Sequence, residues 1–192
     1  HARQTLAALD HGLAVFCQKP MAVTRAEAAE MVARARAVDR LLGVDYSYRH
    51  TDGLREVRRM VRAGELGRVY SIGAVFHNAY GPDKSWCHDP ALSGGGALMD
   101  LGVHLVDQAF WLLDGAEVQV VHGRAFRHGQ PLGGVRAIDD FAAATMHMEA
   151  GPVVDLAVSW NAHAGRDCVI RTTVYGTKGG AEFRNVNGSF LD

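Results

Sequence analysis

Residues 92–115 read LSGGGALMDLGVHLVDQAFWLLDG, in which three consecutive glycines lead into a run with helical periodicity. The apolar side chains of this run form one stripe at helical spacing: Leu98, Leu101, Leu105, Ala109 and Leu112. The stripe predicts a helix over 96–113 that ends at Asp114-Gly115. Glycines cost backbone entropy at a helix start, so we expect a ligand or another backbone to approach closely there.

The same helix carries a carboxylate and an imidazole on one face. Asp100 and His104 are four residues apart, which places them roughly 40° from each other around a helix axis. A carboxylate beside a histidine raises its pKa and orients its ring, so the pair is suited to acid-base work. Asp107 and Trp111 share this face. The alternative is a surface helix with an ordinary ion pair.

Upstream of this helix, residues 1–67 alternate helices and strands. Short apolar runs at 13–17 and 41–48 predict strands, and Thr24 with Glu27 forms a capping box that opens a helix. A further helical stripe follows, which comprises Leu54, Val57, Met60 and Val61 and ends near Gly64 and Gly67.

A lysine directly follows the first of these strands, in the tripeptide Gln18-Lys19-Pro20. Ligands of open α/β sheets bind outside the carboxyl ends of the strands, so Lys19 is a candidate for contact with a cofactor or substrate. The alternative is a solvated surface lysine.

After Gly67 the pattern changes to strands that are each closed by a turn. Their expected ranges are 70–78, 118–127, 139–149, 153–161, 169–175 and 181–186, with an irregular loop over 81–93. Successive strands closed by turns predict a large open antiparallel sheet. We therefore expect two domains, 1–67 and 68–192.

Composition excludes several classes of protein. Twenty Lys and Arg residues against 21 Asp and Glu give a net charge of −1, which argues against nucleic-acid binding. The longest uncharged stretch, 69–82, has 14 residues and is too short to span a membrane. Three separate cysteines without a CxxC pair predict free thiols and a cytoplasmic location.

A metal site is the main alternative chemistry. His88, Asp100 and His104 are possible ligands of a metal-dependent hydrolase, with Cys87 beside them. Cys87 and His88 are adjacent, however, and the chain has no paired ligand spacing of the zinc type, so we expect no metal.

Two motifs resemble one known family. Residues 1–22, which end in CQKPMA, resemble the segment of the Gfo/Idh/MocA family of NAD(P)-dependent oxidoreductases that ends in Glu-Lys-Pro. Residues 92–115 resemble that family's GGGxLxDxGxHxxD motif, and the match extends to about Gly180. The resemblance implies the C-terminal part of a Rossmann domain followed by an α/β domain with a large open antiparallel sheet.

The resemblance also implies an activity and a site. The reaction would transfer a hydride between NAD or NADP and a sugar, inositol or related polyol, and Lys19, Asp100 and His104 would be catalytic. Gln18, Lys19 and Pro20 would contact the cofactor. Arg49 matches a family position near the substrate, and the loop residues Tyr80, Trp86 and His88 would set substrate specificity. Members of the family commonly associate through the sheet, so we expect a homodimer or homotetramer formed through it.

Two departures from the family pattern affect cofactor binding. Gln18 replaces the motif glutamate, and the chain has no G-x-G-x-x-G, so we expect it to be an internal piece of a longer protein. The main rival function is a non-catalytic ligand-binding or regulatory protein on the same fold. The presence of Lys19, Asp100 and His104 together argues against that rival.

Overall fold

The computed structural model describes residues 1–133, 137–149 and 151–188, and it divides the chain into two compact units, His1–Ser47 and Tyr48–Asp192. The first unit contains α1 (Ala2–Asp10), β1 (Val15–Gln18), α2 (Arg25–Ala37) and β2 (Leu42–Asp45). β1 and β2 pair in parallel, which places Gln18 opposite Asp45 where both strands end. The alternating helices and strands predicted for this region are confirmed.

The capping box at the start of α2 is also confirmed. The Thr24 hydroxyl accepts a hydrogen bond from the Glu27 amide at 3.2 Å, and the Glu27 carboxylate accepts one from the Thr24 amide at 3.1 Å. Met31 and Ala35 then face the interior of the unit. The backbone amides of Thr24 and Glu27, which have no acceptor within the helix, are satisfied in this way.

The second unit is built on one large sheet. Its elements are η1 (Ser47–His50), α3 (Asp52–Arg62), β3 (Val69–Asn78), η2 (Ser85–His88), α4 (Pro90–Ser93), η3 (Leu98–Gly102), α5 (Val103–Leu112), β4 (Val118–Arg127), β5 (Gln130–Pro131), β6 (Phe141–Met148), β7 (Val153–Ser159), β8 (Cys168–Gly176) and β9 (Gly180–Arg184). In the described part of the chain seven strands pair in the order β5-β4-β6-β7-β3-β8-β9. The predicted large open sheet is confirmed.

The sheet is mixed rather than wholly antiparallel, because β3 runs parallel to β7. The prediction assumed that each strand turns back onto the previous one. The chain instead leaves β3 through η2, α4 and α5, and it forms β4 and β6 before β7 pairs with β3. The long connection allows the parallel pairing, which a tight turn cannot make.

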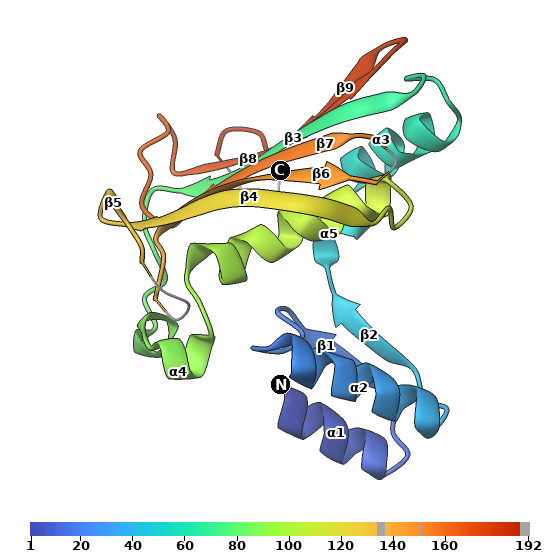
Figure 1. The fold of residues 1–192 in the computed structure, drawn as a ribbon, viewed down its shortest axis with the longest axis vertical. Helices are drawn as coiled ribbons and strands as arrows, with labels where there is room; N and C mark the ends of the chain where they lie inside the picture. The colour runs from blue at the N-terminus through green and yellow to red at the C-terminus, as the bar shows by residue number, and fades with distance from the viewer. Residues whose placement is uncertain (134–136, 150, 189–192) are drawn as a thin grey trace. The chain divides into compact units, whose positions relative to one another are not determined.

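Helices α3 and α5 cover one face of this sheet (Figure 1). The core between them is apolar and includes Leu54 and Val57 of α3, Leu105, Ala109 and Leu112 of α5, and Ile72, Ala74 and Phe76 of β3. The side chains of the strands alternate between this buried face and the open one, as in Val153–Ser159. α3 belongs to the second unit, because its apolar face packs on the sheet. The two units therefore divide before Gly67, the boundary that the sequence predicts.

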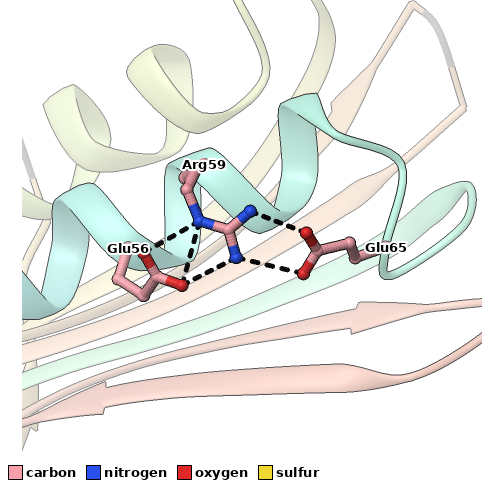
Figure 2. A network of polar contacts seen from close by, with 3 residues as sticks. All are labelled: Glu56, Arg59 and Glu65. Atoms are coloured by element: carbon pink, nitrogen blue, oxygen red, sulfur yellow. Dashed lines mark hydrogen bonds and ion pairs between the residues drawn. The ribbon is translucent and has the colours of Figure 1, made fainter.

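The end of α3 follows the predicted glycine pattern. Gly64 has φ of +70°, its amide bonds the Val61 carbonyl, and the Glu65 amide bonds the Met60 carbonyl, which is a Schellman cap. Arg59 holds Glu65 beyond this cap and Glu56 within the helix (Figure 2). The pKa of both carboxyl groups is lowered by their hydrogen bonds to Arg59.

The loop expected to be irregular over 81–93 contains the short helices η2 and α4, and two boundaries beside the site also differ from the prediction. The strand expected over 41–48 ends at Asp45, and the chain then forms the single turn η1. The hydroxyl of Thr51, which follows this turn, donates to the Tyr48 carbonyl at 2.8 Å. The helix expected over 96–113 begins as the π-helical turn η3 before α5. Among the described helices, none has the length and apolar character needed to cross a bilayer.

Candidate active site

The glycine triplet lies against another segment of backbone. A Cβ on Gly96 would lie 2.6 Å from the Asp139 amide nitrogen and would overlap the Asp139 carbonyl oxygen. The buried Asp139 carboxylate accepts hydrogen bonds from the amides of Gly96 at 3.0 Å and Leu98 at 2.7 Å. The expectation that a ligand or a backbone approaches here is confirmed, and the approaching group is a backbone.

Asp139 therefore fixes the start of the helix that carries the candidate acid-base residues. Its carbonyl also accepts the Ala97 amide at 2.9 Å. The side chain acts as a helix cap supplied from the segment that leads into β6. Sequence reasoning missed Asp139, because nothing in its local pattern relates it to a helix 43 residues away.

Asp100 lies in the π-helical turn and has an indole partner. Trp160, only 2% exposed just beyond β7, donates from Nε1 to Asp100 Oδ2 at 2.9 Å. This bond orients the carboxylate, and Trp160 is a second residue that the sequence did not reveal. π-Helical turns within α-helices occur frequently at functional sites.

His104 lies in the first turn of α5 and is 7% exposed. Its ring contacts Tyr48 edge to face, with centroids 5.0 Å apart, and Phe76 at 6.2 Å. Burial raises the pKa of the Tyr48 hydroxyl above its ordinary value, and Cys168 adds to the shift. Tyr48 therefore stays protonated and serves to pack against the imidazole rather than to accept protons.

Asp107 and Arg49 form an ion pair beside this cluster. Arg49 Nε donates to Asp107 Oδ2 at 2.7 Å, and Arg49 Nη2 donates to Asp107 Oδ1. Burial raises the pKa of Asp107 above its ordinary value, and the guanidinium offsets this only in part. Arg49 is thus engaged by a protein carboxylate at the position where we expected substrate contact.

The predicted specificity loop is largely exposed. Tyr80 is 64% exposed, and the Asp167 carboxylate raises its pKa. Trp86, in η2, is 51% exposed. His88 packs its ring edge to face on Trp160 at 5.8 Å, with Nε2 3.2 Å from the Pro82 carbonyl oxygen. His88 is therefore linked through Trp160 to Asp100.

Gln18, Lys19 and Pro20 follow one another at the end of β1 in the first unit. The Gln18 amide donates to Asp45 Oδ2 at 2.8 Å, and the Lys19-Pro20 peptide bond is cis. Lys19 thus lies at the carboxyl edge of two parallel strands, where open α/β sheets bind ligands. Asp100 and His104 belong to the second unit, and their convergence with Lys19 on one cleft stays a prediction.

The possible metal ligands named from the sequence do not form a cluster in the described part of the chain. Within residues 1–133, 137–149 and 151–188, no three His, Cys, Asp or Glu side chains are grouped so as to hold an ion. His88 contacts the Trp160 ring, and Asp100 accepts from the indole of that tryptophan.

Two family models match this chain. Residues 54–182 match the model described as the GFO/IDH/MocA C-terminal domain, and residues 1–46 match the oxidoreductase family model with an NAD-binding Rossmann fold. The chain belongs to the Gfo/Idh/MocA oxidoreductase family. This confirms the recognition made from the two motifs, and the division between the matched segments agrees with the two units.

Gfo/Idh/MocA relatives match nearly the whole chain. D-glucoside 3-dehydrogenase of Escherichia coli (strain K12) is 28% identical over 192 residues, which cover 94% of this chain and 55% of that protein. Among solved structures, an inositol dehydrogenase homologue complexed with NAD+ from Azotobacter vinelandii matches with a TM-score of 0.86 and 25% identity, covering 98% of this chain and 52% of its own. Levoglucosan dehydrogenase in complex with NADH and L-sorbose has the same TM-score, 26% identity and coverages of 96% and 51%. The chain spans about half the length of these relatives.

Proposed function

We propose that the protein containing this chain is an NAD(P)-dependent dehydrogenase that acts on the CH-OH groups of sugars, inositols or related polyols. The observation that carries the proposal is the pair Asp100 and His104 in one helix start, with the carboxylate oriented by Trp160 and the imidazole enclosed by Tyr48 and Phe76. Such fixed orientation is what a residue that transfers protons to one substrate atom requires. The family relatives named as sugar and inositol dehydrogenases support the same chemistry.

The roles of the residues follow from their chemistry. In the oxidative direction His104 takes the proton from the substrate hydroxyl, Lys19 stabilises the developing charge on that oxygen, and Asp100 orients the imidazole or binds a neighbouring hydroxyl. The carbon loses a hydride and becomes a carbonyl carbon. A bound nicotinamide supplies the acceptor for that hydride.

The end of β1 suits the nicotinamide portion of NAD or NADP. Gln18 and Asp45 make its edge polar, and Lys19 and Pro20 follow directly. Gln18, Lys19 and Pro20 are therefore our proposed cofactor contacts. Tyr80, Trp86 and His88 are our proposed substrate contacts, because His88 contacts the tryptophan that holds Asp100.

We place the protein in the cytoplasm as a homodimer or homotetramer. Cys17 and Cys168 are buried free thiols, which suits a reducing compartment. The open face of the sheet is the proposed contact between copies. We expect neither nucleic acid nor a membrane as a partner.

The test is kinetic and uses the whole protein. Aldoses, glucosides, inositols and anhydro sugars are offered with NAD+ or NADP+ and reduced cofactor is followed by its absorbance. His104→Ala should lower turnover about 10²- to 10⁴-fold, the usual loss when a general acid-base is removed. His163→Ala, which alters an exposed histidine, is the matched control. A protein that binds nicotinamide without turning over any of these substrates would support the non-catalytic alternative.

A further inference from the structure

The first residues of the second unit are joined to α5 at two adjacent points. Tyr48 packs its ring against His104, and Arg49, the next residue, forms the two-bond ion pair with Asp107. His104 and Asp107 are three residues apart on α5 and so lie on neighbouring positions of its surface. The ion pair and the ring contact therefore connect the same turn of η1 to the same turn of α5.

The contact between the Tyr48 and His104 rings does little by itself to fix the orientation of the imidazole. Aromatic contacts are weak and tolerate a range of angles. The two parallel bonds of a guanidinium to a carboxylate, by contrast, fix both distance and plane. Arg49 thus holds the η1 backbone, and with it the Tyr48 ring, at a set position over the imidazole.

We propose that Arg49 and Asp107 are positioning residues for His104, whose ion pair holds Tyr48 against the imidazole and fixes the orientation of that ring. The inference deepens the proposed function and rests on it. It also replaces the substrate-binding role expected for Arg49 by an indirect one. Neither side chain is required to touch the substrate.

The burial of Asp107 supports a role in geometry rather than stability. The Asp107 side chain is 6% exposed, and the Arg49 side chain is 36% exposed. A buried carboxylate loses its hydration, and an ion pair repays that loss incompletely, as the raised pKa of Asp107 shows. An apolar pair of similar volume would stabilise such a position at least as well, but it would not define the angle of the contact.

The closing experiment compares two Asp→Asn variants of the whole protein. Asp107→Asn keeps the shape of the side chain and leaves Arg49, which water still reaches, so the variant should fold. Asp114→Asn is the matched control, because Asp114 also pairs with an arginine, Arg58 at 2.8 Å, but lies exposed beyond the C-terminal end of α5. We expect Asp107→Asn to lower kcat about 10- to 100-fold with KM within about twofold, the scale expected for a misplaced catalytic group. Asp114→Asn should change neither constant by more than about twofold.

A conservative variant and a direct probe complete the test. Arg49→Lys keeps the charge but loses the fork, so its kcat should lie between those of the wild type and Arg49→Gln. The ring signals of His104 in a ¹H–¹⁵N spectrum, assigned by their loss in His104→Ala, should shift in Asp107→Asn and stay in place in Asp114→Asn.

The outcomes separate this inference from the proposed function. If the wild type turns over no substrate, the proposed function fails, and the His104 ring signals still decide the positioning role. Unchanged kcat in a folded, active Asp107→Asn enzyme would overturn the inference, as would unmoved ring signals. A rise in KM with unchanged kcat would also overturn it and would return Arg49 to substrate binding.

Discussion

Asp107 lies within α5 and Asp114 lies just beyond its C-terminal end, and their environments shift their pKa values in opposite directions. Burial raises the pKa of Asp107, so the folded state holds that proton more tightly than the unfolded state does. Its contribution to stability is present below the ordinary carboxyl pKa and is lost as the pH rises through the folded value. Hydrogen bonds from Arg58 and Arg62 lower the pKa of Asp114, so its contribution is present at higher pH and is lost on acidification.

The melting temperatures of Asp107→Asn and Asp114→Asn, each compared with that of the wild type, should therefore change in opposite directions as the pH rises from about 3 to 7. Relative to the wild type, Asp107→Asn should become more stable as the pH rises, because the variant lacks a carboxylate that is costly to ionise. Asp114→Asn should become less stable over the same range. Parallel curves for the two variants would contradict the assignment of opposite shifts.

The candidate site residues that the sequence offers belong to local motifs, and the residues that contact them from distant segments were missed. Asp100 and His104 share one run of helix, and Lys19 follows a recognisable strand, so spacing made them candidates and the family resemblance gave them roles. Trp160 is 60 residues from Asp100, and its partner depends on where β7 ends against η3. Tyr48 was expected in a strand, and only the turn of η1 brings its ring to His104.

At the scale of elements, caps and glycines were predictable and the π-helical turn was not. The capping box of α2 and the cap of α3 are formed by residues close in sequence. The turn η3 depends instead on Asp139, which binds the amides of Gly96 and Leu98 from a distant segment. A helical stripe does not distinguish a π-helical start from an α-helical one, because the apolar face changes little over a single turn.

At the start of this helix, Gly96 is the position where an added side chain would meet the Asp139 backbone most closely. In Gly96→Ala the new methyl group would overlap the Asp139 carbonyl, so the helix start and the Asp139 segment would have to separate. We expect the free energy of unfolding to fall by about 1–3 kcal/mol or more, the cost of overpacking. Gly133→Ala is the control, since a Cβ there meets nothing within 4 Å. Denaturant unfolding of the two variants measures the difference, and equal midpoints would show that the close approach is readily relieved.

At the scale of the whole molecule, the open face of the sheet decides how copies could associate. Its centre is lined by the small residues Gly73, Ala143 and Ala157, in a hollow of roughly 600 Å³. Arg124 and Arg171 lie on the two sides of this centre, and Asp155 and Glu182 lie two register positions away, on the same face. The open face therefore carries charged side chains of both signs.

Charges of both signs on one face suit pairing with a second copy. Rotation about a two-fold axis can bring the arginines of one copy to the acidic residues of the other, and the small residues let the two sheets approach. The exposed side chains of Val120 and Tyr175 add apolar area at one end of the face. A stable interface of this kind buries on the order of 2,000 Å².

A charge placed at the centre of the open face should therefore separate the copies. Ala157→Arg inserts a long cationic side chain between Arg124 and Arg171, where like charges and bulk both oppose close approach. We expect light scattering at micromolar concentration to show a dimer or tetramer for the whole wild-type protein and a smaller species for the variant. Ala33→Arg, on the exposed surface of α2, adds the same side chain elsewhere and should leave the mass unchanged. A monomeric wild type, or an Ala157→Arg variant of wild-type mass, would show that the copies do not associate through this face.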